Sequence, residues 1–148
     1  MTVLLDNKKA RFDYEILETF EAGLILKGWE VKSLKNKQGS LAGSRVLIRG
    51  NEAFLVGLDI QPYQPNNMPN NYEEKRTLKL LLNKKEIKYL DGKLTQKGLT
   101  IVPLKCYTKN NQIKAEIALV QGKKKFDKRE KIKKRDTERD IAREFKRG

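Results

Sequence analysis

The residues that could carry chemistry in this sequence are of few kinds. It has no histidine and one cysteine, Cys106, so the commonest acid–base group and the standard zinc ligand sets are missing. The acidic residues are scattered and form no paired carboxylate motif. Lysine and arginine are abundant, 33 of 148 residues against 19 acidic ones, for a formal net charge of +14. This composition favours binding to a polyanion and argues against catalysis, a cofactor or a bound metal.

A polyanionic partner is either nucleic acid or an anionic membrane, and the sequence favours nucleic acid. It has no run of about 18 apolar residues, and its first residues show no cleavage-site pattern. A lone cysteine cannot form an internal disulfide, which predicts a cytoplasmic location. Cys106 stands in a strand-like stretch and is interpreted as a core residue rather than a nucleophile.

The charge divides the chain into a body and a tail. Residues 121–148 hold 13 basic and 6 acidic residues, a net charge of +7, which is half of the total. Their apolar side chains are too few to bury a helix face, but opposite charges recur at helical spacing, as in Asp127 and Lys131. We therefore expect residues 1–122 to form one domain. Residues 123–148 should form a tail that is disordered when free and helical when bound.

The body is expected to consist mainly of short strands. Their ranges are 13–20, 23–28, 45–49, 53–57, 99–107 and 113–120. Gly50-Asn51-Glu52 and Lys109-Asn110-Asn111-Gln112 separate two pairs of them and predict two hairpins. In the last strand, alternation predicts that Ile113 and Ala115 face the core and that Lys114 faces solvent.

Two helices are expected between these strands, at residues 30–35 and from Asn83 to beyond Leu90. Asn83 is an N-cap candidate with Glu86 three residues on, and Gly98 follows the end of that helix. Residues 61–72 are rich in proline and asparagine and predict a mobile loop. The fold prediction is mainly β: an OB-like closed barrel of about six strands with two to three small helices and a flexible basic C-terminal tail.

Beyond this point the sequence resembles a known family, small protein B (SmpB), which binds transfer-messenger RNA (tmRNA, or SsrA RNA). The resemblance rests on motifs that occur in order from residue 7 to about 135. They are Asn7-Lys8-Lys9-Ala10, Glu21-Ala22-Gly23, the stretch from Gly28 to Leu34, Lys79-Leu80-Leu81-Leu82-Asn83, Val102-Pro103-Leu104, Gly122-Lys123-Lys124 and Asp127-Lys128-Arg129-Glu130. Each motif is weak alone, and together they are specific.

The resemblance implies an OB-like barrel and a role in ribosome rescue by trans-translation. It implies binding to the transfer-RNA-like domain of tmRNA and delivery to stalled ribosomes, together with the elongation factor that carries aminoacyl-tRNA. The tail is implied to enter the empty messenger channel and the decoding centre and to form a helix there. The implied partners are therefore tmRNA, the ribosome and this elongation factor.

The resemblance also implies site residues. Those for RNA binding are Asn7, Lys8, Tyr14, Glu21, Lys79, Leu81, Asn83, Lys114, Gly122, Lys123 and Lys124. Those for ribosome contact in the tail are Phe126, Asp127, Lys128, Arg129, Lys131, Ile132, Lys133, Lys134 and Arg135. Structural alternatives stay open for several: Asn83 as a cap, Leu81 as core, and Phe126 as a staple for the first turn of the tail. The sequence departs from the family pattern at Gln61, Leu78 and Thr137.

Two other functions compete with tmRNA binding. A ribosomal or general single-strand-binding OB protein fits the composition almost as well, and only the ordered motifs argue against it. An RNA-processing enzyme is disfavoured by the missing histidine and the missing metal-ligand spacing.

Overall fold

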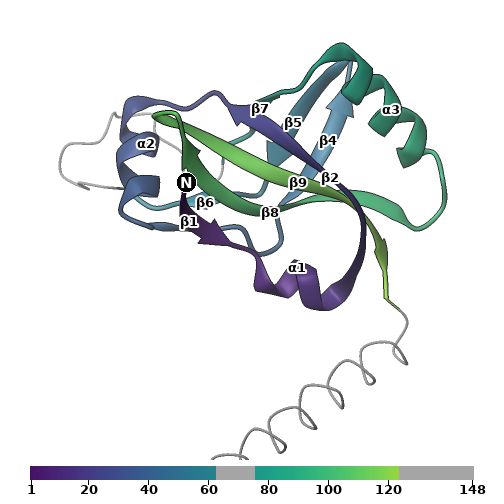
Figure 1. Cartoon of the computed structure of the whole chain (residues 1–148), viewed down its shortest axis with the longest axis horizontal. Coiled ribbons are helices and arrows are strands. Elements are labelled where there is room, and N and C mark those ends of the chain that lie inside the picture. Colours follow the sequence, from purple (N-terminus) through teal and green to yellow (C-terminus); the bar gives the residue numbers. More distant parts are fainter. Residues whose placement is uncertain (63–75, 124–148) are drawn as a thin grey trace, which may run out of the picture.

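The computed structural model describes residues 1–62 and 76–123. Its elements in chain order are β1 (Thr2–Asp6), α1 (Lys8–Asp13), β2 (Tyr14–Leu24), α2 (Gly28–Lys35), β3 (Gly39–Ser40), β4 (Arg45–Arg49), β5 (Glu52–Val56), β6 (Asp59–Ile60), β7 (Leu78–Leu81), α3 (Lys84–Leu94), β8 (Leu99–Lys109) and β9 (Gln112–Gly122). Seven strands form one antiparallel sheet in the order β1-β8-β9-β2-β7-β5-β4, and β3 pairs with β6. Figure 1 shows α2 and α3 near opposite ends of the sheet and α1 beside β8.

Both predicted hairpins are confirmed. Gly50 and Asn51 join β4 to β5, and Asn110 and Asn111 join β8 to β9, all four with positive φ angles. Two successive residues with positive φ make a type I′ turn, whose twist matches the twist of paired strands. Glycine and asparagine are the residues that tolerate this conformation best, which is why the sequence signal was reliable.

The prediction of a closed barrel is wrong. The two end strands of the large sheet are β1 and β4, and no ladder joins them within residues 1–62 and 76–123. The segment between β3 and β4 meets the end of β1 instead, through a side-chain hydrogen bond from Asn7 to the carbonyl of Leu41. No ladder closes the sheet, although β4, whose ends carry Arg45 and Arg49, packs beside β8. Charged side chains at an edge discourage pairing with other chains.

The remaining differences concern element boundaries. The fold has nine strands in the described residues rather than about six. Strand β2 runs from Tyr14 to Leu24, so the predicted strand 23–28 is divided between the end of β2, the connection at residues 25–27 and the first residue of α2. The predicted helix at 30–35 begins earlier, at Gly28. The short helix α1 was not located from the sequence. The predicted mobile loop at 61–72 and the tail helix fall mostly or wholly outside the described residues.

The core lies on both sides of β8 and β9. On one side Ile113, Ala115 and Ile117 are buried against the rest of the sheet, as alternation predicted. On the other side Ala118 and Val120 form a second cluster with Ala10, Val102 and Leu104, against which Tyr14 packs. Helix α1 thus covers one half of the outer face. The other half, toward the β8–β9 turn, is left for charged side chains.

The two longer helices are fixed at their N-termini by capping. The side chain of Asn83 accepts from the backbone N–H of Glu86 at 2.8 Å, and Glu86 returns a bond to the N–H of Asn83 at 3.3 Å, which is the predicted capping box. In α2 the carboxylate of Glu30 accepts from the N–H of Lys27 at 2.7 Å. Glu30 is 1% exposed and also forms an ion pair with Arg76 at 2.6 Å, which ties α2 to the start of β7.

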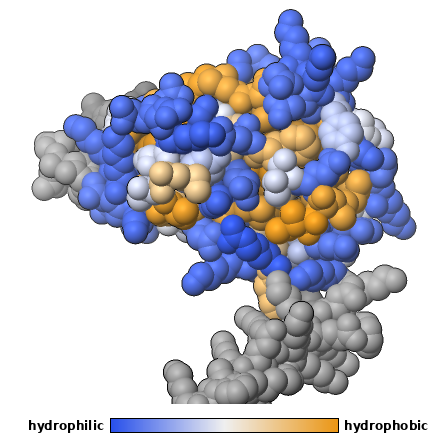
Figure 2. Space-filling view, in the orientation of Figure 1, coloured by the Kyte–Doolittle hydropathy of each residue, from blue (hydrophilic) through white to orange (hydrophobic). Residues whose placement is uncertain are grey.

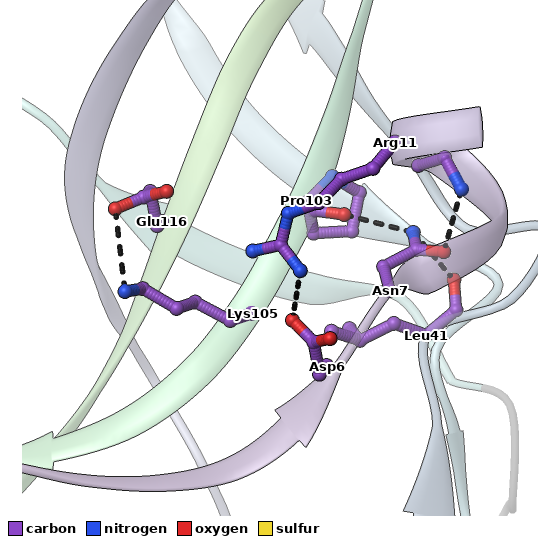
Figure 3. A network of polar contacts seen from close by, with 8 residues as sticks. Asp6, Asn7, Arg11, Leu41, Pro103, Lys105 and Glu116 are labelled. Carbon is purple, nitrogen blue, oxygen red and sulfur yellow. Dashed lines mark hydrogen bonds and ion pairs between the residues drawn. The ribbon is translucent and has the colours of Figure 1, made fainter. Parts of the chain in front are cut away.

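Asn7 joins three segments through one buried amide. It is 4% exposed, and its Oδ1 accepts from the N–H of Ala10 at 3.2 Å, which caps α1. Its Nδ2 donates to the carbonyl of Pro103 at 2.8 Å and to that of Leu41 at 3.3 Å. Figure 3 shows this network beside the ion pair of Asp6 and Arg11. The Asn7 side chain therefore fixes α1 against β8 and against the chain before β4.

We predict that Asn7→Ala destabilises the fold by about 2–3 kcal/mol, since it removes a helix cap and the buried hydrogen bond to the carbonyl of Pro103, whereas the carbonyl of Leu41 still accepts from Ser44. Urea or thermal unfolding measures this. Lys8→Ala, at an exposed neighbour, should change stability by less than about 0.5 kcal/mol. If Asn7→Ala unfolded like the parent chain, the structural role argued here would be wrong.

Candidate nucleic-acid interface

The predicted RNA-binding residues lie in two groups at opposite ends of one strand ladder. Strands β2 and β9 pair from Tyr14 opposite Gly122 to Gly23 opposite Lys114. The eight residue steps between Gly122 and Lys114 span about 27 Å at roughly 3.4 Å per residue. The structure therefore does not bring all of the predicted residues into one site. One group surrounds α1, and the other lies at the end near the β8–β9 turn.

The group around α1 contains Lys8, Tyr14, Gly122 and Lys123, with Asn7 beneath them. Lys8 is exposed at the first turn of α1, and Tyr14 is half-buried on the second core cluster. The backbone N–H of Lys123 donates to the carbonyl of Asp13 at 3.1 Å, and its Nζ lies 3.4 Å from the carbonyl of Arg11. These bonds fix the point at which the chain leaves the sheet.

A cavity of about 440 Å³ lies beside this group. Its lining includes Tyr14 and the basic residues Lys9 and Arg45, together with parts of β8. Neither basic residue was selected from the sequence, because they come from segments 36 residues apart. Asn7 also lines this cavity. Its side-chain amide and carbonyl groups are already bonded within the protein, so its role here is structural.

The group near the turn is built around the carboxylate of Glu21. The hydroxyl of Tyr107 donates to Oε2 of Glu21, and Nζ of Lys109 lies 3.3 Å from the same oxygen. The hydrogen bond from Tyr107 is the main cause that holds the pKa of Glu21 below its usual value, and Lys109 and Lys114 add to this effect. Glu21 is exposed and therefore presents an ionised acceptor at neutral pH.

Lys114 lies near Glu21, and both Lys114 and Leu81 lie opposite Gly23 in the sheet. They line a cavity of about 350 Å³ together with Gly23, Lys35 and Asn111, over a floor of apolar residues from β2, α2 and β9. Leu81 is 53% exposed, which makes it a surface residue rather than the core residue of the open alternative. A Cβ atom at Gly23 would lie 3.2 Å from Cβ of Leu81, so glycine is what allows β2 and β7 to approach here.

Lys79 and Asn83 flank this group on either side of Leu81. Nζ of Lys79 forms an ion pair with Glu52 on β5 at 3.1 Å, and both side chains are about half exposed. Asn83 is exposed and its side-chain oxygen is used in the capping box of α3. The capping alternative for Asn83 is therefore confirmed, and its Nδ2 group remains available to a partner by position.

Sequence reasoning missed Tyr107 and its basic neighbours on β8. Lys105, Tyr107 and Lys109 alternate along the strand and share the outer face with Glu21 and Lys114. Nζ of Lys105 lies 5.6 Å from the centre of the Tyr107 ring and 3.8 Å from Glu116. The alternation of these three residues is visible in the sequence. Their nearness to Lys114 and Glu21 becomes apparent only from the register of β8 and β9, which the turn at Asn110 and Asn111 sets.

The other predicted site residues fall outside the described residues. They are Lys124 and the tail residues Phe126, Asp127, Lys128, Arg129, Lys131, Ile132, Lys133, Lys134 and Arg135. Their roles stay predictions.

The described surface is mixed in character. Figure 2 shows hydrophilic residues over much of one face, with hydrophobic patches between them. Among residues 1–62 and 76–123, no helix is long and apolar enough to cross a membrane, and no three His, Cys, Asp or Glu side chains could hold a metal ion. Cys106 is buried, and burial raises the pKa of its thiol to about 12, which confirms it as a core residue rather than a nucleophile.

Comparison with known proteins gives one consistent result. The profile of the SmpB protein family matches residues 4–147. The SsrA-binding protein of Gloeothece citriformis is 50% identical over 145 residues, which cover 98% of this chain and 94% of the relative. The SsrA-binding protein of Mycoplasma mycoides subsp. mycoides is 47% identical and covers 97% of both chains.

A solved structure agrees with these sequence matches. It is described as "tmRNA-SmpB: a journey to the center of the bacterial ribosome", and its matching chain has a TM-score of 0.70 and 45% identity. The match covers 84% of this chain and 87% of that one. The ordered motifs, the mainly β fold and the near full-length matches all agree, and this chain belongs to the SmpB family.

Proposed function

We propose that this protein binds the transfer-RNA-like domain of tmRNA and delivers it to stalled ribosomes for trans-translation. The observation that carries the proposal is the match to SsrA-binding proteins over 98% of the chain, including the basic tail. The solved relative, described as tmRNA-SmpB with the bacterial ribosome, supports the same two partners. The elongation factor that carries aminoacyl-tRNA accompanies the complex in this proposal.

The chain is not an enzyme, in agreement with the expectation from its composition, because the SmpB family binds RNA without catalysing a reaction. Its contribution is to hold one RNA in place on another particle. The body supplies a folded surface with charged groups at both ends of β2 and β9. The tail supplies half of the net charge of +14.

In this proposal the tail acts in the messenger channel and the decoding centre. A helix of residues 127–147 would be about 30 Å long at 1.5 Å per residue. Phosphates lining the channel would neutralise lysine and arginine side chains and reduce their mutual repulsion. An intact messenger would occupy the same space, so the tail can enter only when the messenger is missing. Because the repulsion between the basic side chains falls only in the channel, the tail forms its helix on binding.

The general test is the identity of the RNA that the protein retains. We expect the full-length protein, recovered from a bacterial lysate, to carry tmRNA in excess over other RNAs of equal length. A general single-strand-binding protein would instead carry RNAs in proportion to their abundance, and that result would contradict the proposal.

The contribution of Lys114 can be measured through salt dependence. Binding should weaken steeply as salt rises, because each phosphate contact releases counterions. Lys114→Ala should reduce the slope of log affinity against log salt by about one, and Lys88→Ala, at an exposed position on α3, should leave it unchanged. An unchanged slope for Lys114→Ala would remove this residue from the phosphate contacts.

The body and the tail should separate in function. A chain ending after Lys125 keeps the described sheet and the bonds of Lys123 to α1, so we expect its melting temperature and most of its tmRNA affinity to remain.

Lys128→Glu with Arg129→Glu should abolish tagging of stalled chains while sparing tmRNA binding. Lys88→Glu with Lys97→Glu makes the same change in net charge on the body and should leave tagging intact. Normal tagging by the tail variant would exclude the tail from the mechanism.

A further inference from the structure

The end of the sheet near the β8–β9 turn combines a fixed carboxylate with an open space beside it. Glu21 and Gly23 are two residues apart on β2 and therefore lie on the same face, about 7 Å apart. Because Gly23 has no side chain, the Leu81 side chain packs directly over this position, and both residues line a cavity of about 350 Å³. Lys114 lies opposite Gly23 on β9, and Leu81 borders the same space.

The orientation of the Glu21 carboxylate is set by Tyr107. The Tyr107 side chain is 3% exposed, so its ring is held by packing, and its hydroxyl donates to Oε2 of Glu21. Lys109 contributes long contacts of 3.3 and 3.4 Å from a half-exposed side chain. A carboxylate has about four acceptor positions, and Tyr107 occupies one of them. The others can accept from a ligand that displaces Lys109.

Glu21 and the acidic residue that faces it each have a basic partner. Glu21 lies directly opposite Glu116 in the ladder between β2 and β9. Like charges in opposite positions of a sheet destabilise it. Lys105 offsets this at Glu116 with an ion pair at 3.8 Å, and Lys109 does so at Glu21 at 3.3 Å. The ionised carboxylate of Glu21 is therefore stabilised where it lies at the surface, in agreement with its lowered pKa.

An ionised carboxylate discriminates among unpaired bases by their donors. On its Watson–Crick edge guanine presents the N1–H and N2 amino donors side by side, which match the two oxygens of a carboxylate. Cytosine, adenine and uracil each place an acceptor next to the donor on that edge, and this acceptor would repel the carboxylate. Single-stranded bases are commonly read on this edge by proteins that bind RNA.

The cavity that Gly23, Leu81 and Lys114 line, one step along the sheet from Glu21, has the chemistry for the rest of such a nucleotide. Its volume is about 350 Å³, in the lower part of the range of small-ligand pockets. Apolar side chains, among them Leu24, Leu26 and Val31, provide a surface for the face of a base. The ammonium groups of Lys35 and Lys114 at the rim can contact the attached phosphates.

We propose that this end of the sheet holds one unpaired guanine nucleotide of the bound RNA. Glu21 accepts from the N1–H and N2 amino groups of the base, and Lys114 contacts its phosphate. Tyr107 is the positioning residue that fixes the carboxylate. The inference rests on the proposed function, since the nucleotide belongs to the transfer-RNA-like domain of tmRNA.

Replacing guanosine by inosine, which lacks only the N2 amino group, tests this proposal. The RNA is the transfer-RNA-like domain of tmRNA, with each unpaired guanosine replaced in turn. We expect one replacement to weaken binding to the full-length protein about tenfold, the usual size of a hydrogen bond to a charged group. The same replacement should change binding by less than twofold for Glu21→Gln, whose amide cannot accept at both positions.

Two further variants separate positioning from folding. Tyr107→Phe keeps the buried ring and removes the hydroxyl, and it should reduce the discrimination against inosine to about threefold or less without changing affinity for the inosine-containing RNA. Glu116→Gln changes the facing carboxylate and should keep the full tenfold effect. Melting temperatures of all variants verify that each is folded.

Three results would overturn the proposal. The first is that the protein binds the RNA tightly and no inosine replacement weakens this binding. The second is that Glu21→Gln loses as much affinity on the inosine replacement as the parent protein does. The third, full discrimination in Tyr107→Phe, would remove Tyr107 from the site. Failure of the unmodified RNA to bind the parent protein is a different result and would contradict the proposed function itself.

Discussion

The buried amide of Asn7 is the interaction on which the rest of this structure depends. Its three hydrogen bonds join the N-terminal strand, the cap of α1, the chain before β4 and the middle of β8. Without these bonds α1 would lose the anchor that places it over Val102 and Val120, and the outer face of the sheet would expose apolar side chains. A polar group with all its partners met fixes one arrangement where apolar contacts alone would allow several.

The placement of α1 divides the functional surface in two. Where α1 covers the sheet, the outer face of β8 and β9 is apolar, and where it ends, the same strands carry Lys105, Tyr107, Lys114 and Glu116. The outer face of β8 and β9 therefore has an apolar half, packed under α1, and a charged half, nearer the β8–β9 turn. The tail starts beside the packed half, at Lys123, and the carboxylate of Glu21 lies in the charged half. The charged half of the sheet and the point where the tail begins are thus held at a fixed separation.

Features that depend on neighbouring residues could be predicted from the sequence. The two asparagine-containing turns and the capping box of α3 follow from conformational preferences within four residues, and both are present. Barrel closure depends on whether β1 and β4 meet, which is decided by contacts far apart in the chain. The sequence pattern of single strands contains no information on that point, so the closed barrel was predicted wrongly.

The candidate site shows the same division. Glu21, Leu81 and Lys114 were selected because they match family motifs, and the structure places them together. The motif that contains Asn7 marks this residue as important but does not say that the amide is buried. Tyr107 has no motif, and its relation to Glu21 requires the pairing of three strands. Residues that act through another residue are the ones that a sequence match does not reveal.

The length of β9 constrains how proteins of this kind can diverge. Its 11 residues pair with β2 on one side and β8 on the other, and successive side chains alternate between the core and the outer face. Inserting or deleting one residue would move Lys114 and Glu116 into the core and Ile113 and Ala115 to the surface. A change of one residue therefore requires a compensating irregularity such as those already present in β2 between Ile16 and Glu18 and in β8 between Pro103 and Lys105. Variation in length should therefore concentrate outside the paired strands.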